Sequence, residues 1–290
     1  MIDFIVNPTA GGKKGKKIKK ALVCIEKYLT ENMVDFSFHY TERAKQATEL
    51  TTSLIEKGAT TIVVIGGDGT LHEVINGFTN FEQTALGIIP LGTGNDFASA
   101  LNLPKDPVEA LKLIVHGTPK YTDFMQMPTV RGLNIIGMGV DVDVLRRYNS
   151  LKKKTKFGYT LSLLKTLFDI HYIDFKAEMK GEVNDYHSFI ACVANGDRYG
   201  GGMRVCPPAN PTDGKLDFVA VDEINGLKII NALLKLKKGK VLSLKQAYHT
   251  TMEEVKIYPT GNYTVNVDGE LYENIPFEIK IVSDKLRVYR

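Results

Sequence analysis

An apolar segment that runs directly into a glycine-rich turn is the feature that most restricts the fold of this chain. Thr61 to Ile65 read as a buried strand, Gly66-Gly67-Asp68-Gly69-Thr70 follow without a gap, and Leu71 to Asn76 read as a helix. Glycine permits backbone angles and close approaches that a β-carbon forbids, and a helix N-terminus favours an anion. The turn therefore predicts a nucleotide-phosphate site, with Asp68 within reach of a metal or its water. Taken alone, an ordinary turn with a capping Asp is the alternative.

Strand-like and helix-like segments alternate over about the first 125 residues. The predicted strands are 2–6, 36–40, 62–65 and 86–89, and the predicted helices are 16–29, 44–57, 71–77 and 107–116. Such alternation predicts a mostly parallel α/β sheet, in which ligands bind beyond the carboxyl ends of the strands. Asn7, the 66–70 turn and Gly92 each follow a predicted strand, so we expect them to converge at one edge.

After about residue 123 the pattern changes to short β-rich stretches separated by polar or glycine turns. The predicted strands are 134–136, 188–194, 216–221, 254–258, 263–267, 277–282 and 286–289, and helical insertions are predicted around 161–169 and 227–236. We predict an α/β domain over residues 1–123. A β-rich, antiparallel, sandwich-like domain follows over residues 124–290, and its last strand can return to the first domain.

Two further glycine turns support the first. Pro90-Leu91-Gly92-Thr93-Gly94-Asn95-Asp96 and Val6-Asn7-Pro8-Thr9-Ala10-Gly11-Gly12-Lys13 each follow an apolar strand and precede a helix-like stretch. Neither matches the P-loop pattern, and the dinucleotide pattern G-x-G-x-x-G is absent at the first strand. Three such turns at one sheet edge favour a binding site over simple scaffolding.

These motifs, with later ones in the same order, resemble the diacylglycerol kinase catalytic-domain superfamily. The similarity is greatest to its bacterial soluble lipid kinases, relatives of sphingosine kinases and of NAD kinase. The matching segments are Val6 to Gly11, Gly66 to Thr70, Gly92 to Asp96, Asn195-Gly196, Gly200 to Gly202, Pro207-Pro208, Asp213 to Asp217 and Val267 to Glu270. NAD kinases lack the Asn-Pro opening and normally carry an Asn-Glu pair where this chain has Asn195-Gly196-Asp197, which disfavours that alternative.

The resemblance implies an NAD kinase/diacylglycerol kinase-like fold, in which the domain 1–123 binds ATP and the domain 124–290 binds the lipid substrate. It also implies roles for individual residues. The residues implied in ATP binding are Asn7, Pro8, Gly11, Thr41, Gly66, Gly67, Asp68, Gly69, Thr70, Glu73, Gly92, Thr93 and Asn95. Asp68 would also act in catalysis by positioning Mg²⁺, through water. A further, structural Mg²⁺ site would use the Asp217 side chain together with groups of Asp213, Gly214, Lys215 or Val219. A hairpin with an Asp-Gly turn is the alternative for this loop.

Glu270 is the predicted catalytic base. An acceptor hydroxyl must lose its proton as it attacks the γ-phosphorus, and a carboxylate within hydrogen-bond reach can take it. The resemblance assigns this role to the Glu of Asp268-Gly269-Glu270, and a solvent-exposed hairpin turn is the alternative. We expect an ATP- and Mg²⁺-dependent kinase that converts diacylglycerol to phosphatidate. Another lipid alcohol (phosphatidylglycerol, a sphingoid base or undecaprenol) and a non-catalytic nucleotide- or lipid-binding regulator remain alternatives.

The net charge is only +4, but lysines cluster in three segments. They are Lys13, Lys14, Lys16, Lys17, Lys19 and Lys20; Lys152, Lys153, Lys154 and Lys156; and Lys235, Lys237, Lys238 and Lys240. Basic clusters suit an anionic membrane surface, where the helix 227–236 could also lie, whereas solvated or core-packed helices are the alternative. No aromatic residues alternate with the first cluster, so a nucleic-acid partner is disfavoured.

Three widely spaced cysteines without a C-x-x-C motif argue against a disulfide or zinc framework and for a reducing cytoplasm. Cys24 lies among Ile18, Leu22, Ile25 and Leu29 at helical spacing, which predicts a core position. No apolar run approaches the roughly 20 residues that span a bilayer, and the N-terminus lacks a signal-peptide layout. We therefore expect a cytoplasmic enzyme at the inner membrane surface, and an exposed sheet edge would allow a homodimer.

Overall fold

The computed structural model describes residues 1–290 except 12–14, 152–157, 159–160, 163–164, 167–170 and 225–227. Lys13, Lys14, the basic segment Lys152 to Lys156 and much of the predicted helix 161–169 thus lie outside the described residues. The chain forms two compact units. Unit 1 holds residues 1–123 and 283–290, and unit 2 holds residues 124–282.

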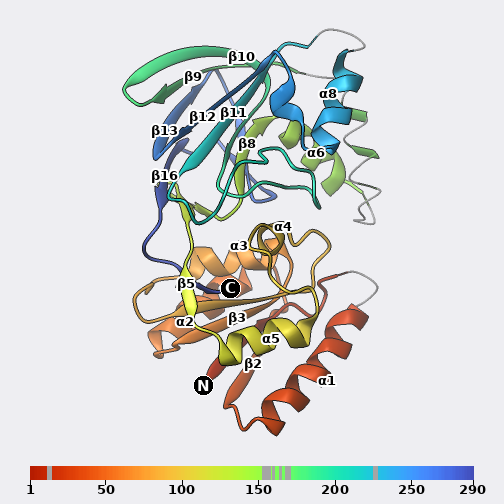
Figure 1. Ribbon diagram of the computed structural model, residues 1–290, viewed down its shortest axis with the longest axis vertical. Helices are drawn as coiled ribbons and strands as arrows, with labels where there is room; N and C mark the ends of the chain where they lie inside the picture. Colours follow the sequence, from red (N-terminus) through yellow and green to blue (C-terminus); the bar gives the residue numbers. More distant parts are fainter. Residues whose placement is uncertain (12–14, 152–157, 159–160, 163–164, 167–170, 225–227) are drawn as a thin grey trace. The chain divides into compact units, whose positions relative to one another are not determined.

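Unit 1 is an α/β unit built on a six-stranded sheet (Figure 1). In chain order its elements are β1 (Ile2–Val6), α1 (Lys16–Glu31), β2 (Phe36–Tyr40), α2 (Gln46–Glu56), β3 (Thr61–Gly66), α3 (Asp68–Gly77), β4 (Ala85–Pro90), α4 (Asp96–Ala100), α5 (Pro107–His116), β5 (Pro119–Tyr121) and β17 (Arg287–Tyr289). The strand order is β2-β1-β3-β4-β17-β5, and only the β17–β5 pair is antiparallel. The predicted, mostly parallel sheet is confirmed. Residues 283–290 belong to unit 1 through β17, a return of the last strand that the sequence analysis allowed.

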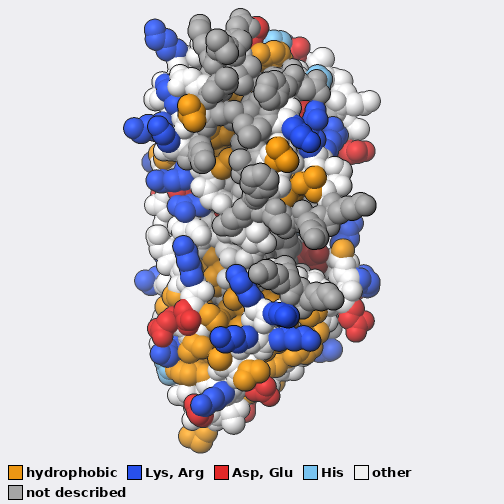
Figure 2. All heavy atoms as spheres, turned by 90° about the vertical axis from the view of Figure 1, so that its right-hand side faces the viewer, with side chains coloured by type: hydrophobic (Ala, Val, Ile, Leu, Met, Phe, Trp, Pro, Cys, Tyr) orange, Lys and Arg blue, Asp and Glu red, His pale blue; other side chains and the backbone are white. Residues whose placement is uncertain are grey.

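Helix α1 shows how the helices of unit 1 attach to the sheet. Its buried residues Ile18, Ala21, Ile25 and Leu29 form one stripe that packs with α5 on strands β1 and β3. Its lysines point outward, and Figure 2 shows basic side chains over this part of the surface. The predicted core position of Cys24 is wrong, because this side chain is exposed. Cys24 lies one residue before Ile25, a step of roughly 100° around the helix, which takes it off the stripe.

Unit 2 consists of one large antiparallel sheet, on which the described helices α6 and α8 pack (Figure 1). In chain order its elements are β6 (Phe124–Gln126), β7 (Arg131–Gly132), β8 (Ile135–Gly139), α6 (Val140–Asn149), β9 (Ile173–Met179), β10 (Glu182–Ala194), β11 (Leu216–Asp222), α8 (Lys228–Lys237), a 3-10 helix (Val241–Ser243), β12 (Ala247–Met252), β13 (Glu254–Pro259), β14 (Thr264–Val267), β15 (Glu270–Glu273) and β16 (Glu278–Val282). The sheet branches at the long strand β10, which pairs with β8, β9 and β11.

The sheet of unit 2 curls around one apolar core. Side chains from both ends of the strand order, such as Met125 on β6 and Val265 on β14, belong to the same buried cluster. The opposite face packs against α6 and α8 through a second cluster, to which Ala232 and Leu236 of α8 belong. Helix α8 thus has a core-packed face, which is the alternative that the sequence analysis gave for the predicted helix 227–236. Among the described residues, no helix combines the length and apolarity that crossing a bilayer requires.

Candidate nucleotide site and acceptor hairpin

Three glycine turns meet at one edge of the unit 1 sheet, because β1, β3 and β4 are neighbours and parallel. Asn7 follows β1, and its Nδ2 donates a 3.0 Å hydrogen bond to the Thr70 hydroxyl at the start of α3. A Cβ on Gly11 would lie 2.5 Å from the Leu91 carbonyl oxygen, so the first turn also touches the turn after β4. The predicted convergence of the three turns is confirmed.

Gly67 and Gly92 bring two of these turns into backbone contact. A Cβ on Gly92 would lie only 2.3 Å from the Gly67 Cα, a distance that no side chain can occupy. The Leu91 amide donates to the Gly66 carbonyl at 2.8 Å and holds the two turns together. Both glycines are therefore required by the packing of the site and not only by a bend in the chain.

Asp68 joins the second turn to the third. Its carboxylate accepts the backbone amide of Asn95 at 2.7 Å and that of Asp96 at 2.8 Å, where α4 begins. Burial and the nearby Asp96 raise the pKa of Asp68 from 3.8 to about 6, although hydrogen bonds from the backbone amides of Asn95, Asp96 and Phe97 oppose the shift. A carboxylate offers about four lone-pair sites, so the three amides leave one for a further ligand. A cation held through water fits this carboxylate, because a positive charge would relieve the repulsion between Asp68 and Asp96.

The other predicted nucleotide residues divide into two groups. Gly69 and Thr93 are exposed on the turns and accessible to a ligand. Three others bond within the protein: Thr41 Oγ1 donates to the Val6 carbonyl at 3.4 Å, Asn95 Oδ1 accepts the Gly92 amide at 2.9 Å, and Glu73 accepts the Lys45 and Ala47 amides at 2.9 and 3.1 Å. These side chains shape the site and hold the start of α2; their contact with ATP stays a prediction.

Glu270 lies on a tight hairpin of unit 2. Asp268 and Gly269 connect β14 to β15 with φ values of 52° and 99°, the positive φ pair of a two-residue hairpin turn. Glu270 is the first residue of β15, and its side chain is exposed. Asp268 accepts the amides of Leu133, Asn134 and Ile135 at 2.5, 2.8 and 3.0 Å. The hairpin that carries Glu270 is therefore anchored to the start of β8.

Two buried residues that the sequence analysis did not single out extend this anchor. Asn266 Oδ1 accepts the Gly269 amide at 2.8 Å, and its Nδ2 donates to Asp141 at 3.1 Å. Asp141, the second residue of helix α6, is buried, and this burial raises its pKa from 3.8 to about 7. The sequence indicates this bridge only weakly, because Asn266 and Asp141 stand out there only as polar residues within apolar stretches.

The family models match both units of the chain. The diacylglycerol kinase catalytic domain matches residues 2–127, and the YegS C-terminal NAD kinase beta sandwich-like domain matches residues 134–290. The chain belongs to the diacylglycerol kinase family of lipid kinases. This is the family that the ordered motifs along the sequence indicated.

Known members span nearly the whole length of this kinase. A diacylglycerol kinase of Staphylococcus carnosus is 27% identical, over 99% of this chain and 94% of its own. The crystal structure of a diacylglycerol kinase from Bacillus anthracis shares the fold with a TM-score of 0.72 at 22% identity, covering 99% of this chain and 96% of that one. An Archaeoglobus fulgidus NAD kinase in complex with ATP shares it with a TM-score of 0.53 at 16% identity, covering 99% and 92%.

The residues that the resemblance implies for a structural Mg²⁺ site lie partly in an exposed turn and partly in the buried strand β11. Asp213 is exposed, and its Oδ1 accepts the Lys215 amide at 3.1 Å beside Gly214, whose φ is 71°. Asp217 is instead buried within β11, where its Oδ1 lies 2.6 Å from His249 Nε2. Val219 is buried in the same strand. A ring nitrogen of His249 and the sulfur of Cys206 lie close to the Asp217 carboxylate, and neither belongs to the all-oxygen ligand set that Mg²⁺ prefers.

A cavity of about 650 Å³ opens in unit 2 beside the start of α6. Met138 and Gly139 are among the residues that line it. Its wall also contains Asp143, Arg146 and His171, and Arg146 donates to the Thr264 hydroxyl at 2.6 Å. This polar lining suits a headgroup better than an acyl chain.

Proposed function

We propose that this kinase transfers the γ-phosphate of ATP to the free hydroxyl of diacylglycerol and so forms phosphatidate. The observation that carries the proposal is the convergence of three glycine turns at the start of α3, with Asp68 between them. Helix α3 has Gly67 as its N-cap, no side chain caps it, and Gly69 in its first turn is exposed. Such an end favours phosphate oxygens. The acceptor is taken from the diacylglycerol kinase name that the S. carnosus relative carries.

The residues of the chain divide the chemistry between them. The glycine turns bind the ATP phosphates, and Lys17, whose Cδ lies 4.0 Å from the Cβ position of Gly11, adds a positive charge. Asp68 orients Mg²⁺, which when bound neutralises phosphate charge. The acceptor hydroxyl oxygen forms a bond to the γ-phosphorus while the bond from that phosphorus to the ADP oxygen breaks. Glu270 takes the hydroxyl proton.

Phosphate transfer from γ-labelled ATP to a lipid panel in anionic mixed micelles tests the proposal. The panel holds diacylglycerol, phosphatidylglycerol, sphingosine and undecaprenol, with NAD as the soluble control. We expect label in phosphatidate, and none when Mg²⁺ is removed by a chelator. Label only in another lipid would replace diacylglycerol as the acceptor. Bound ATP without any transfer would favour the regulator over the enzyme.

Glu270→Gln tests the base. The substitution keeps the shape of the side chain but removes its ability to accept a proton, so we expect kcat to fall about 10²–10⁴-fold. ATP affinity, measured by calorimetry, should stay within about twofold. Glu273→Gln is the matched control, because Glu273 is an exposed glutamate on the same strand. Equal losses in the two variants, or lost ATP affinity in Glu270→Gln, would remove Glu270 from this role.

We further propose that helix α1 docks the kinase on an anionic membrane surface. Lys16, Lys19 and Lys20 are exposed at the start of α1, whose first turn has no acidic residue. Positive charges at a helix N-terminus oppose the helix dipole, so these lysines weaken the free helix unless an anion faces them. At about 1 kcal/mol per lysine, replacing all three with Gln should weaken binding to anionic vesicles about hundredfold. Unchanged vesicle binding would place the docking surface elsewhere.

A further inference from the structure

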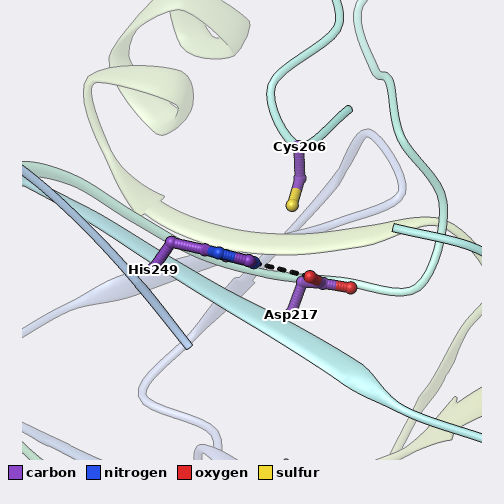
Figure 3. A group of neighbouring side chains, drawn as sticks. All are labelled: Cys206, Asp217 and His249. Carbon is purple, nitrogen blue, oxygen red and sulfur yellow. Dashed lines mark hydrogen bonds and ion pairs between the residues drawn. The ribbon is translucent and has the colours of Figure 1, made fainter. Parts of the chain in front are cut away.

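A thiol, a carboxylate and an imidazole meet in unit 2, in a part of the molecule that the phosphoryl transfer does not use. They belong to Cys206, Asp217 and His249, and their donor atoms all lie within 4.8 Å of one another. Figure 3 shows the Cys206 sulfur directed toward the bonded pair of Asp217 and His249. Cys206 and Asp217 are buried, whereas the His249 side chain is 29% exposed and leaves a route from solvent.

The strand register places two of these side chains together. Asp217 on β11 pairs with Thr251 on β12, and Val219 pairs with His249. Residues two apart on a strand face the same side, so Asp217 and His249 are diagonal neighbours on one face of the sheet. This is also the face on which Val219 packs in the cluster with Cys206.

Cys206 reaches the same face from the segment between β10 and β11. Its amide donates to the Asp197 carbonyl at 3.2 Å, and its carbonyl accepts the Ala209 amide at 3.0 Å. The Asp197 carboxylate is in turn held by Arg198 at 2.6 Å and by Arg204 at 2.8 Å. The thiol is thus fixed by backbone and ion-pair contacts at its place over β11.

We propose that Cys206, Asp217 and His249 bind Zn²⁺ or a similar soft divalent cation, with water as the fourth ligand. A thiolate, an imidazole and a carboxylate together form a donor set typical of Zn²⁺, whereas Mg²⁺ requires oxygen ligands. The bound ion would fasten the segment between β10 and β11 to the β11–β12 pair. It would thereby replace the structural Mg²⁺ that the family resemblance places at Asp217.

Binding of the cation must displace protons. The hydrogen bond between His249 Nε2 and Asp217 Oδ1 holds one proton between these two atoms, and a thiol binds a metal only as the thiolate. A metal releases the thiol proton and takes the place of the shared one. Affinity should therefore rise with pH.

Titration of the chelator-treated full-length protein with Co²⁺, a spectroscopic substitute for Zn²⁺, tests the proposal. We expect a near-ultraviolet thiolate-to-cobalt band and visible bands of tetrahedral Co²⁺, both removed by a stoichiometric amount of Zn²⁺. Cys206→Ser should abolish the thiolate band and weaken Co²⁺ binding at least about hundredfold, since even outer-shell changes cost 10–100-fold. Cys24→Ser, which alters the exposed cysteine of α1, should leave both unchanged.

A second measurement uses the unaltered chain and does not depend on whether a variant folds. Zn²⁺ should slow alkylation of Cys206 in mildly destabilising urea, with the modified cysteine identified by peptide mass, while Cys24 reacts at the same rate with and without metal. Millimolar Mg²⁺ should give no such protection. The proposal is overturned if Co²⁺ gives no thiolate band, if Cys206→Ser binds Co²⁺ as the parent does, or if Mg²⁺ protects as well as Zn²⁺.

Discussion

Asp68→Asn should remove a loss of folding stability that the ligand-free enzyme undergoes as the pH rises. Asp68 has a pKa of about 6 in the folded protein against 3.8 for the unconstrained side chain, because burial and Asp96 disfavour its charge. When folding raises the pKa of a carboxyl group, the group does not lower the free energy of unfolding at pH values below its unfolded-state pKa. At pH values above its folded-state pKa it lowers the free energy of unfolding by the full amount that corresponds to the pKa difference. The rise corresponds to about 3 kcal/mol, of which about 2 kcal/mol falls between pH 4.5 and pH 8.

The assay is urea unfolding of the parent and of Asp68→Asn at several pH values, followed by circular dichroism because the chain has no tryptophan. Asparagine does not titrate, so the free energy of unfolding of the parent should fall by about 2 kcal/mol relative to the variant between pH 4.5 and pH 8. Asp106→Asn is the matched control. Asp106 also accepts two amides at a helix N-terminus, at 2.9 and 3.1 Å, but it is exposed.

Two results would refute this reasoning. One is a difference in free energy of unfolding between the parent and Asp68→Asn that stays constant over the whole pH range. The other is an equal pH dependence in Asp106→Asn. Mg²⁺ gives an additional check, since a cation near Asp68 favours the ionised carboxylate and should restore part of the stability lost at pH 8. Asp68→Asn should also be inactive, so this variant would lose function while its relative stability at high pH improves.

Two further substitutions test the packing of the two sites. Gly92→Ala would place a Cβ 2.3 Å from the Gly67 Cα, so we expect the two turns to separate. The free energy of unfolding, measured by thermal unfolding, should fall by about 1–3 kcal/mol, and ATP affinity should fall at least tenfold. An unchanged ATP affinity would contradict the close approach. Asn266→Ala removes the bridge between Asp141 and the Gly269 amide, so we expect kcat to fall about tenfold while ATP affinity, measured by calorimetry, is retained. Unchanged turnover would show that the hairpin holds Glu270 without Asn266.

The sequence predicted most of the architecture, because strands followed by glycine turns and helices are local patterns. The parallel sheet, the antiparallel second half and the meeting of three turns at one edge follow from hydrophobic period and from the rules of parallel sheets. Cys24 shows the limit of such patterns, since one step around a helix separates a buried residue from an exposed one. The motifs also led to the correct family.

Side-chain partners distant in the sequence were beyond prediction. Asp68 was predicted beside a metal, but its bonds to the amides of Asn95 and Asp96 exist only because two turns pack backbone to backbone. Asp268 was a motif residue without a role until the fold placed the 133–135 amides around its carboxylate. In each pair the residues are more than twenty positions apart, and no periodicity connects them.

The sequence by itself determined the fold class, the positions of the glycine turns and the family, because each depends on short segments read in order. Only the tertiary structure decided which donors surround Asp217. Three scattered cysteines argued against a zinc framework, yet the β11–β12 register and the segment before β11 bring Cys206 and His249 to this carboxylate. The physical reason is that a set of metal ligands depends on strand register and on the path of the loops. A register shift of one residue would turn the side chains of the strand to the opposite face of the sheet.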